Sequence, residues 1–164
     1  MKLALVVFAL ALAPLAIAQP FPSSCKFYED LIAVAPVKFE SFRAAKLGPD
    51  TYASTLRPVR YPKCLVGGRS ESVFACLGNP GRESLIRALY NDERERIRKC
   101  LPSWETAPLL DADGPAKSVD GLRFIQRTTK GDVTISVGLY REKAGERLYR
   151  MTFGVIWLPT PLGV

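Results

Sequence analysis

The first apolar pattern after residue 25 has the spacing of a helix. One stripe is formed by Phe27, Leu31, Ala35, Phe39 and Phe42, which recur at steps of four and three residues. Pro36 interrupts this stripe, so we expect a kink or two short helices that meet there. The segment Gly48-Pro49-Asp50 is expected to end the helical region.

Two strand-like runs follow, at residues 51–66 and 72–78, with a polar and glycine-rich segment between them. Pairing the runs about Ser70 places Val66 opposite Phe74 and Cys64 opposite Cys76. This register predicts a Cys64–Cys76 disulfide and leaves Cys25 to pair with Cys100. Spacing alone does not choose among the three connectivities that four cysteines allow.

A second helix is expected to begin at Asn79, a favourable N-cap residue followed by Pro80, and to end at Pro102. Its predicted buried stripe consists of Ile86, Leu89, Tyr90, Ile97, Cys100 and Leu101. Its outer face carries two oppositely charged pairs at i,i+4, Asp92 with Arg96 and Glu95 with Lys99. The mixed signs of this face argue against a nucleic-acid patch, and we expect no nucleic acid as a partner.

The last third of the chain shows the clearest alternation of apolar and polar residues. A strand at 122–128 is followed by a two-residue turn at Lys130-Gly131, a strand at 133–140, a loop at 143–145 and a further strand. This register places Leu122, Phe124 and Gln126 opposite Leu139, Val137 and Ile135, and those in turn opposite Tyr149, Met151 and Phe153. We expect Trp104 and Trp157 to belong to the core. The predicted fold is α+β, an antiparallel sheet of about five strands packed on one face by two helices, in the order α-β-β-α-β-β-β, with two disulfides.

The N-terminus has the pattern of a targeting segment. Lys2 precedes the apolar stretch from Leu3 to Leu15, and Ala16-Ile17-Ala18 fits a signal-peptidase site. We expect a signal peptide at residues 1–18, cleavage after Ala18, and no transmembrane segment afterwards. Residues 19–164 are expected to form a single domain with a frayed tail at 159–164. The chain is therefore predicted to be exported, to the periplasm or the extracellular medium, where disulfides persist.

Composition excludes several kinds of chemistry. The 164 residues include no His, which excludes His-dependent catalytic triads and His-ligated metals. The four cysteines have no tight Cys-x-x-Cys spacing, so disulfides are favoured over a metal site. We expect no cofactor and no metal. The net charge is +7, of which one charge belongs to Lys2 in the predicted signal peptide.

Two motifs point weakly to chemistry. Asp111 and Asp113 resemble the start of a calcium loop, and Asp120 could join them, but the remaining ligand positions do not fit. Ser23 and Lys26 have a Ser-x-x-Lys spacing without the supporting elements of penicillin-recognising enzymes. The other carboxylates are scattered along the chain. We therefore do not expect an enzyme.

The face of the sheet opposite the apolar rows is the candidate binding surface. The predicted register places Arg123, Gly138 and Arg150 in one cross-strand row, with small residues such as Gly154 in the middle of the face. Guanidinium groups suit carboxylate and phosphate partners, and glycines let a partner approach closely. The predicted partner-binding residues are Arg57, Arg60, Arg123, Arg127 and Arg150. An ordinary solvated sheet face is the alternative interpretation.

These patterns lead to three functional hypotheses. The first is an exported, non-enzymatic binding, inhibitor or adaptor module that docks an anionic protein through this Arg-flanked face. The alternative is an envelope-associated basic protein held to anionic lipid or polysaccharide. The second alternative is an unrecognised hydrolase that depends on carboxylates. Salt separates the first two hypotheses, because a purely electrostatic association weakens strongly at about 0.5 M salt.

Overall fold

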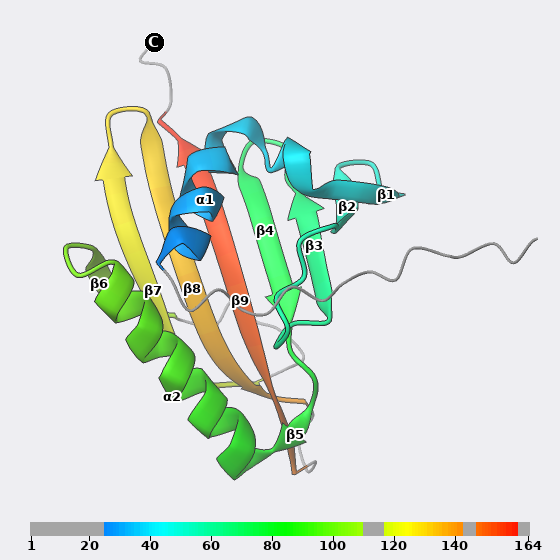
Figure 1. The fold of residues 1–164 in the computed structure, drawn as a ribbon, viewed down its shortest axis with the longest axis vertical. Helices are drawn as coiled ribbons and strands as arrows, with labels where there is room; N and C mark the ends of the chain where they lie inside the picture. Colours follow the sequence, from blue (N-terminus) through cyan, green and yellow to red (C-terminus); the bar gives the residue numbers. More distant parts are fainter. Residues whose placement is uncertain (1–24, 110–116, 143–146, 161–164) are drawn as a thin grey trace, which may run out of the picture.

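The computed structural model describes residues 25–109, 117–142 and 147–160 (Figure 1). The predicted signal peptide lies outside these ranges. The elements are α1 (Lys26–Val34), η1 (Ala35–Val37), η2 (Glu40–Phe42), β1 (Arg43–Gly48), β2 (Thr51–Ser54), β3 (Lys63–Gly67), β4 (Ser72–Leu77), β5 (Gly81–Arg82), α2 (Glu83–Cys100), β6 (Glu105–Pro108), β7 (Lys117–Thr128), β8 (Gly131–Arg141) and β9 (Leu148–Pro159). Within the described ranges, no helix is long and apolar enough to cross a membrane.

The strands form one antiparallel sheet, with α1 and α2 on the same face (Figure 1). The order is β1-β2-β3-β4-β9-β8-β7-β6, and β5 pairs with β9 as well. The α+β class, the antiparallel sheet and the two covering helices are confirmed. The number of strands was wrong, because the sheet has nine strands rather than about five. The additional strands arise from residues 43–48, 81–82 and 105–108 and from the division of residues 51–66 into two strands.

The first helical region divides at Pro36, as its sequence predicts. The helix α1 ends at Val34, and two short 3-10 turns follow. Lys38 and Phe39 take left-handed backbone angles between those turns, which keeps Phe39 fully buried. The helical region ends at Phe42 instead of at residues 48–50, because residues 43–48 form the edge strand β1.

Both predicted disulfides are present, Cys25–Cys100 and Cys64–Cys76. The predicted register of β3 and β4 is confirmed, with Val66 opposite Phe74. The run at 51–66 is not one strand, however. Pro58 and Pro62 lie between β2 and β3, and proline cannot donate to a strand ladder.

The second helix begins at Glu83, four residues after the predicted start at Asn79. Gly81 and Arg82 pair with Tyr149 and Leu148 of β9, so their backbone groups belong to the sheet, and α2 begins at Glu83. The helix ends at Cys100, before Pro102, as predicted.

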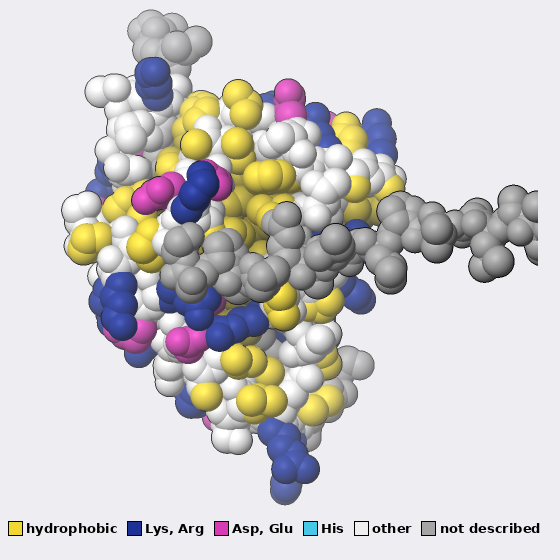
Figure 2. All heavy atoms as spheres, viewed as in Figure 1, with side chains coloured by type: hydrophobic (Ala, Val, Ile, Leu, Met, Phe, Trp, Pro, Cys, Tyr) yellow, Lys and Arg dark blue, Asp and Glu magenta, His cyan; other side chains and the backbone are white. Residues whose placement is uncertain are grey.

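One of the two ion pairs predicted on the outer face of α2 is present, and the other is not. Asp92 and Arg96 form the predicted i,i+4 ion pair. Glu95 pairs with Arg98 instead of with Lys99. Figure 2, drawn from the helix side, shows Lys and Arg side chains beside Asp and Glu side chains around the helices. This face therefore carries both signs of charge.

The register of β7, β8 and β9 differs from the prediction by two residues. Phe124 lies opposite Ile135 rather than Val137, and Val137 lies opposite Phe153 rather than Met151. The turn is one residue earlier, because the Thr128 hydroxyl donates to the carbonyl of Gly131 and accepts from two backbone N–H groups. A shift of two residues leaves every side chain on its predicted face. The predicted loop at 143–145 lies outside the described residues.

The core lies between the helices and the inner face of the sheet. Phe153 of β9 is at its centre, with ring contacts to Phe27, Tyr28, Tyr61 and Phe74 at centroid distances of 5.8–6.3 Å. The two tryptophans, Trp104 and Trp157, are partly buried and pack against this core, as predicted.

The C-terminal tail begins later than residue 159. Pro159 is the last residue of β9, and the backbone N–H of Thr160 donates to the carbonyl of Lys130. Residues 159 and 160, the first two of the predicted tail, therefore pair with the sheet at the end of β9. Residues 161–164 lie outside the described ranges.

Candidate functional site

The face of the sheet that the helices leave uncovered carries a row of small residues. Ala75 of β4, Gly154 of β9 and Ser136 of β8 are aligned across three neighbouring strands. Leu65 continues this row on one side and Arg123 on the other. Because side chains alternate along a strand, the same strands present Phe74, Phe153 and Ile135 to the core on the opposite face.

A groove of about 470 Å³ runs over this row. Leu65 and Leu77 are 41% and 39% exposed at its edge, so together with the groove they form a contiguous apolar patch on the uncovered face. The side of the groove near β8 is formed by Tyr140 and Leu109. The complete lining is Lys63, Leu65, Val73, Phe74, Ala75, Cys76, Leu77, Leu109, Ser136, Tyr140, Thr152, Phe153, Gly154 and Ile156. Most of these residues are apolar or small, so the groove suits an apolar side chain.

The predicted row of Arg123, Gly138 and Arg150 is wrong. Arg123 lies opposite Ser136, and Arg150 lies opposite Tyr140, because of the two-residue difference in register. Arg123 nevertheless borders the groove, since Ser136 forms part of its lining. Its Nε donates to the carbonyl of Pro108 at 3.1 Å.

Arg127 and Arg150 lie on the uncovered face and each has an acidic partner. Nη1 of Arg127 lies 2.6 Å from Oε2 of Glu105, and its side chain is 64% exposed. Arg150 forms an ion pair with Glu142. The sheet face is therefore less basic than the sequence pattern suggests.

Arg57 and Arg60 do not extend the row of arginines. Both lie in the segment between β2 and β3, outside any strand. Nε of Arg57 donates to the carbonyl of Ser54. Arg60 reaches α2, on the helix side of the sheet, where Nη2 lies 2.7 Å from Oδ2 of Asp92. The structure thus separates these two residues from the candidate face.

The two glycines predicted to expose the backbone differ from each other. Gly138 is buried, and a side chain built there would collide with Tyr140 at 2.5 Å and approach Leu109 at 3.2 Å. Gly154 is only partly buried and lines the groove, where its nearest side-chain atom is the Ser136 hydroxyl at 3.1 Å. Close approach to the backbone is therefore possible at Gly154 and not at Gly138.

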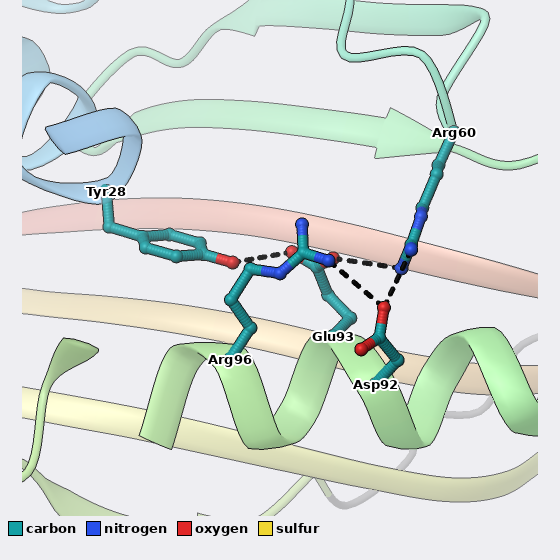
Figure 3. A network of polar contacts seen from close by, with 5 residues as sticks. All are labelled: Tyr28, Arg60, Asp92, Glu93 and Arg96. Atoms are coloured by element: carbon teal, nitrogen blue, oxygen red, sulfur yellow. Dashed lines mark hydrogen bonds and ion pairs between the residues drawn. The ribbon is translucent and has the colours of Figure 1, made fainter. Parts of the chain in front are cut away.

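The sequence pattern missed a buried polar network on the helix side of the sheet (Figure 3). Glu93 of α2 is 0% exposed. The Tyr28 hydroxyl donates to its Oε1 at 2.8 Å, and Nη1 of Arg60 lies 3.7 Å from its Oε2. Asp92 binds Arg60 and also Arg96, the latter at 3.0 Å. The network joins α1, α2 and the segment before β3.

Burial raises the pKa of Glu93, while the hydrogen bond from Tyr28 and the charges of Arg96 and Arg60 act to lower it. Perturbed carboxyl groups often mark active sites, but such groups must also meet a substrate. The side chain of Glu93 has no contact with solvent. We therefore interpret the network as a structural connection between the two helices.

This pKa shift predicts a pH dependence of stability that Glu93→Gln should remove. The folded state holds the Glu93 proton at higher pH than the unfolded chain, so wild-type stability falls as pH rises from the unfolded pKa through the folded pKa. Glutamine still accepts the hydrogen bond from Tyr28 and does not ionise. Urea unfolding between about pH 4 and pH 8 should show the variant gaining stability relative to wild type as pH rises.

The carboxyl group of Asp92, next to Glu93, changes stability with pH in the opposite direction. It is present in both wild type and Glu93→Gln. The hydrogen bond from Arg60 lowers the pKa of Asp92, so its contribution to stability is lost as pH falls through its folded pKa. Taking the difference between wild type and Glu93→Gln at each pH removes this shared contribution. A difference that stays constant with pH would show that Glu93 has an ordinary pKa.

No cluster of three His, Cys, Asp or Glu side chains able to hold a metal occurs in the part of the chain that the structure describes. Asp120 is within this part and belongs to β7. The other two residues of the weak calcium motif, Asp111 and Asp113, lie outside it, as does Ser23 of the Ser-x-x-Lys spacing.

The chain matches no known protein-family model, and the search of curated proteins finds none that matches it. Function is therefore inferred from the two faces of the sheet and from the charges around them.

Proposed function

We propose that this protein is an exported, non-enzymatic binding module whose uncovered sheet face docks on an acidic partner protein. The groove over Ala75, Gly154 and Ser136 is the observation that carries the proposal. An apolar side chain of the partner would enter this groove. The two disulfides support export, since such bonds persist in oxidising compartments.

The apolar edge of the groove supplies the reason for binding. Leu65 and Leu77 leave a substantial part of their surfaces in water, and Val73 of β4 and Ile156 of β9 form a cross-strand pair on the same face. Burying one such side chain fully contributes about 1.5–3 kcal/mol. Small residues at the centre of a groove with large residues at its rim form a shape that one protruding side chain can fill.

Charge complementarity supports an acidic partner. The chain has a net charge of +7, of which only one charge belongs to Lys2 in the predicted signal peptide, and Lys63 and Arg123 stand at the two ends of the groove region. Positive groups at the rim of an interface speed association with an acidic surface and orient it. The apolar groove and the basic rim together fit a protein that presents an apolar residue among acidic ones.

Two observations support a non-enzymatic role. The sequence contains no His. Burial raises the pKa of the Glu93 carboxyl group, but its side chain is buried inside the fold and cannot meet a substrate. A general acid must reach the atom that it protonates.

Replacing Leu65 and Leu77 together with serine should abolish partner capture with little change in stability. Both side chains are partly exposed and point away from the core, so truncation opens no internal cavity. The measurement is affinity capture from an envelope extract in 0.5 M salt, followed by mass spectrometry and by titration of the purified captured protein. We expect a single acidic protein that binds wild type and not the variant.

The matched control is Leu47→Ser with Leu85→Ser, since these leucines are 61% and 59% exposed and lie away from the groove. The control should capture the same protein as wild type. Equal loss of capture in both double variants would contradict the groove as the binding site. Capture of only anionic lipid or polysaccharide at low salt, with nothing retained at 0.5 M salt, would favour the envelope-associated alternative.

A further inference from the structure

A second hollow has a volume of about 900 Å³, and its lining residues come from the starts of α2 and β9 and from the end of β8. These segments meet at the end of the sheet near β5 (Figure 1). It shares no lining residue with the groove on the sheet face. Its lining is Arg82, Glu83, Ser84, Arg87, Arg141, Arg147, Leu148 and Tyr149. Four arginines and one glutamate line this hollow, which gives it an excess of three positive charges.

Two of the arginines are held in place by neighbours. Nη2 of Arg87 lies 2.7 Å from Oε1 of Glu83. Arg141 donates from Nη2 to the hydroxyl of Tyr149 at 2.9 Å and from Nε at 3.3 Å, and it stacks over the same ring. Guanidinium groups fixed in this way lose little conformational freedom when a ligand binds.

The other two arginines, Arg82 and Arg147, form no hydrogen bond or ion pair with any residue that the structure describes. The pairing of β5 with β9 places Arg82 opposite Leu148, directly after Arg147 in the chain. Both arginines line the hollow, and neither has an acidic partner among the residues that the structure describes. A bound anion would supply such a partner.

The start of α2 adds a further attraction for negative charge. The helix has 18 residues, and its N-cap Arg82 provides no side-chain hydrogen bond to the first turn. The backbone N–H groups at a helix start are donors, and the helix dipole places partial positive charge there. Glu83 and Ser84 of that first turn line the hollow.

We infer that this hollow binds a small polyvalent oxyanion, that is, a soluble molecule carrying two or more phosphate or sulfate groups. Arginine forks bind the oxygens of such groups in pairs. The volume and the excess charge suit several anionic groups better than one carboxylate. The hollow is separate from the sheet face, so the inference does not depend on the proposed function.

Tripolyphosphate is the probe, titrated calorimetrically into the disulfide-bonded protein in 150 mM salt. Wild type should bind it saturably at a ratio of one to one. The double variant Arg82→Ala with Arg147→Ala should bind at least tenfold more weakly, because it loses both unpartnered guanidinium groups. Both side chains are exposed and form no hydrogen bond or ion pair with a described residue, so melting temperature should be unchanged.

The control for net charge is Arg69→Ala with Arg98→Ala, which also removes two positive charges but lies outside the hollow. It should bind within about twofold of wild type. Equal weakening in both double variants would overturn the inference, because binding would then depend on overall charge. Absence of saturable binding by wild type would also overturn it.

A sedimentation experiment with vesicles distinguishes a soluble ligand from a lipid headgroup. Vesicles of phosphatidylglycerol and phosphatidylcholine are sedimented with wild type at the same salt concentration. We expect tripolyphosphate to bind without vesicles present. Association with vesicles in the absence of any binding of tripolyphosphate would overturn the inference of a soluble ligand.

Discussion

Phe153→Ala should lower the free energy of unfolding by about 3–5 kcal/mol, one of the two largest effects expected for a change in this chain. Phe153 is 1% exposed and has ring contacts with four other aromatic residues. Its removal costs the transfer free energy of the ring and leaves a cavity that rigid neighbours fill only in part. Urea unfolding monitored by circular dichroism measures the loss.

The control is the adjacent residue of the same strand. Thr152 lies on the uncovered face, so Thr152→Ala should change stability by less than about 1 kcal/mol. If the two variants were equally destabilised, the assignment of the two faces of β9 would be wrong.

Replacing Cys25 and Cys100 together with alanine should lower the free energy of unfolding by about 4–5 kcal/mol. This disulfide joins the start of α1 to the end of α2 across a sequence separation of 75 residues. In the chain-entropy model, a cross-link that closes a long loop removes many conformations from the unfolded chain. Equilibrium unfolding in urea, without reductant, measures the difference.

A substitution next to Cys25 tests whether changes at the start of α1 lower stability even when the disulfide is kept. Lys26 is exposed and forms an i,i+4 ion pair with Asp30. Lys26→Ala should therefore cost less than about 0.5 kcal/mol. A loss below about 1 kcal/mol in the cysteine double variant would mean that the unfolded chain gains little freedom when the bond is removed.

The strong alternation of the middle strands allowed the two faces of the sheet to be predicted. Val66 and Phe74 define a register that pairs Cys64 with Cys76, and the second disulfide follows by elimination. The turn at Thr128 could not be placed from its glycine alone, because a side-chain hydroxyl closes it one residue earlier. The register error of two residues left every side chain on its predicted face, because strand side chains alternate with a period of two.

The edge strands could not be predicted because they carry little apolar pattern. Residues 43–48 of β1 are mostly exposed, and β6 ends in Pro108. The two residues of β5 are ordered by β9, far away in the sequence. Such segments become strands because an existing sheet edge offers hydrogen-bond partners, and a local pattern does not report this.

The buried carboxylate was missed although its position carried a signal. Glu93 falls between Tyr90 and Ile97 on the same stripe of α2, at steps of three and four residues. Its stabilising partners, Tyr28 and Arg60, come from distant segments, so no local pattern indicates a buried charge at this position. The acidic partners of Arg127 and Arg150 were also missed. Glu105 and Glu142 could not be assigned to these arginines from their spacing in the sequence.

Photocrosslinking from the uncovered sheet face is the most direct test of the proposed docking surface. A photoreactive phenylalanine analogue is placed at Leu65, beside the groove, and at Ala33, an exposed position of α1 on the helix side. We expect the same acidic protein to be crosslinked in the envelope from Leu65 and not from Ala33. Crosslinking from Ala33 alone, or from neither position, would contradict docking through the sheet face.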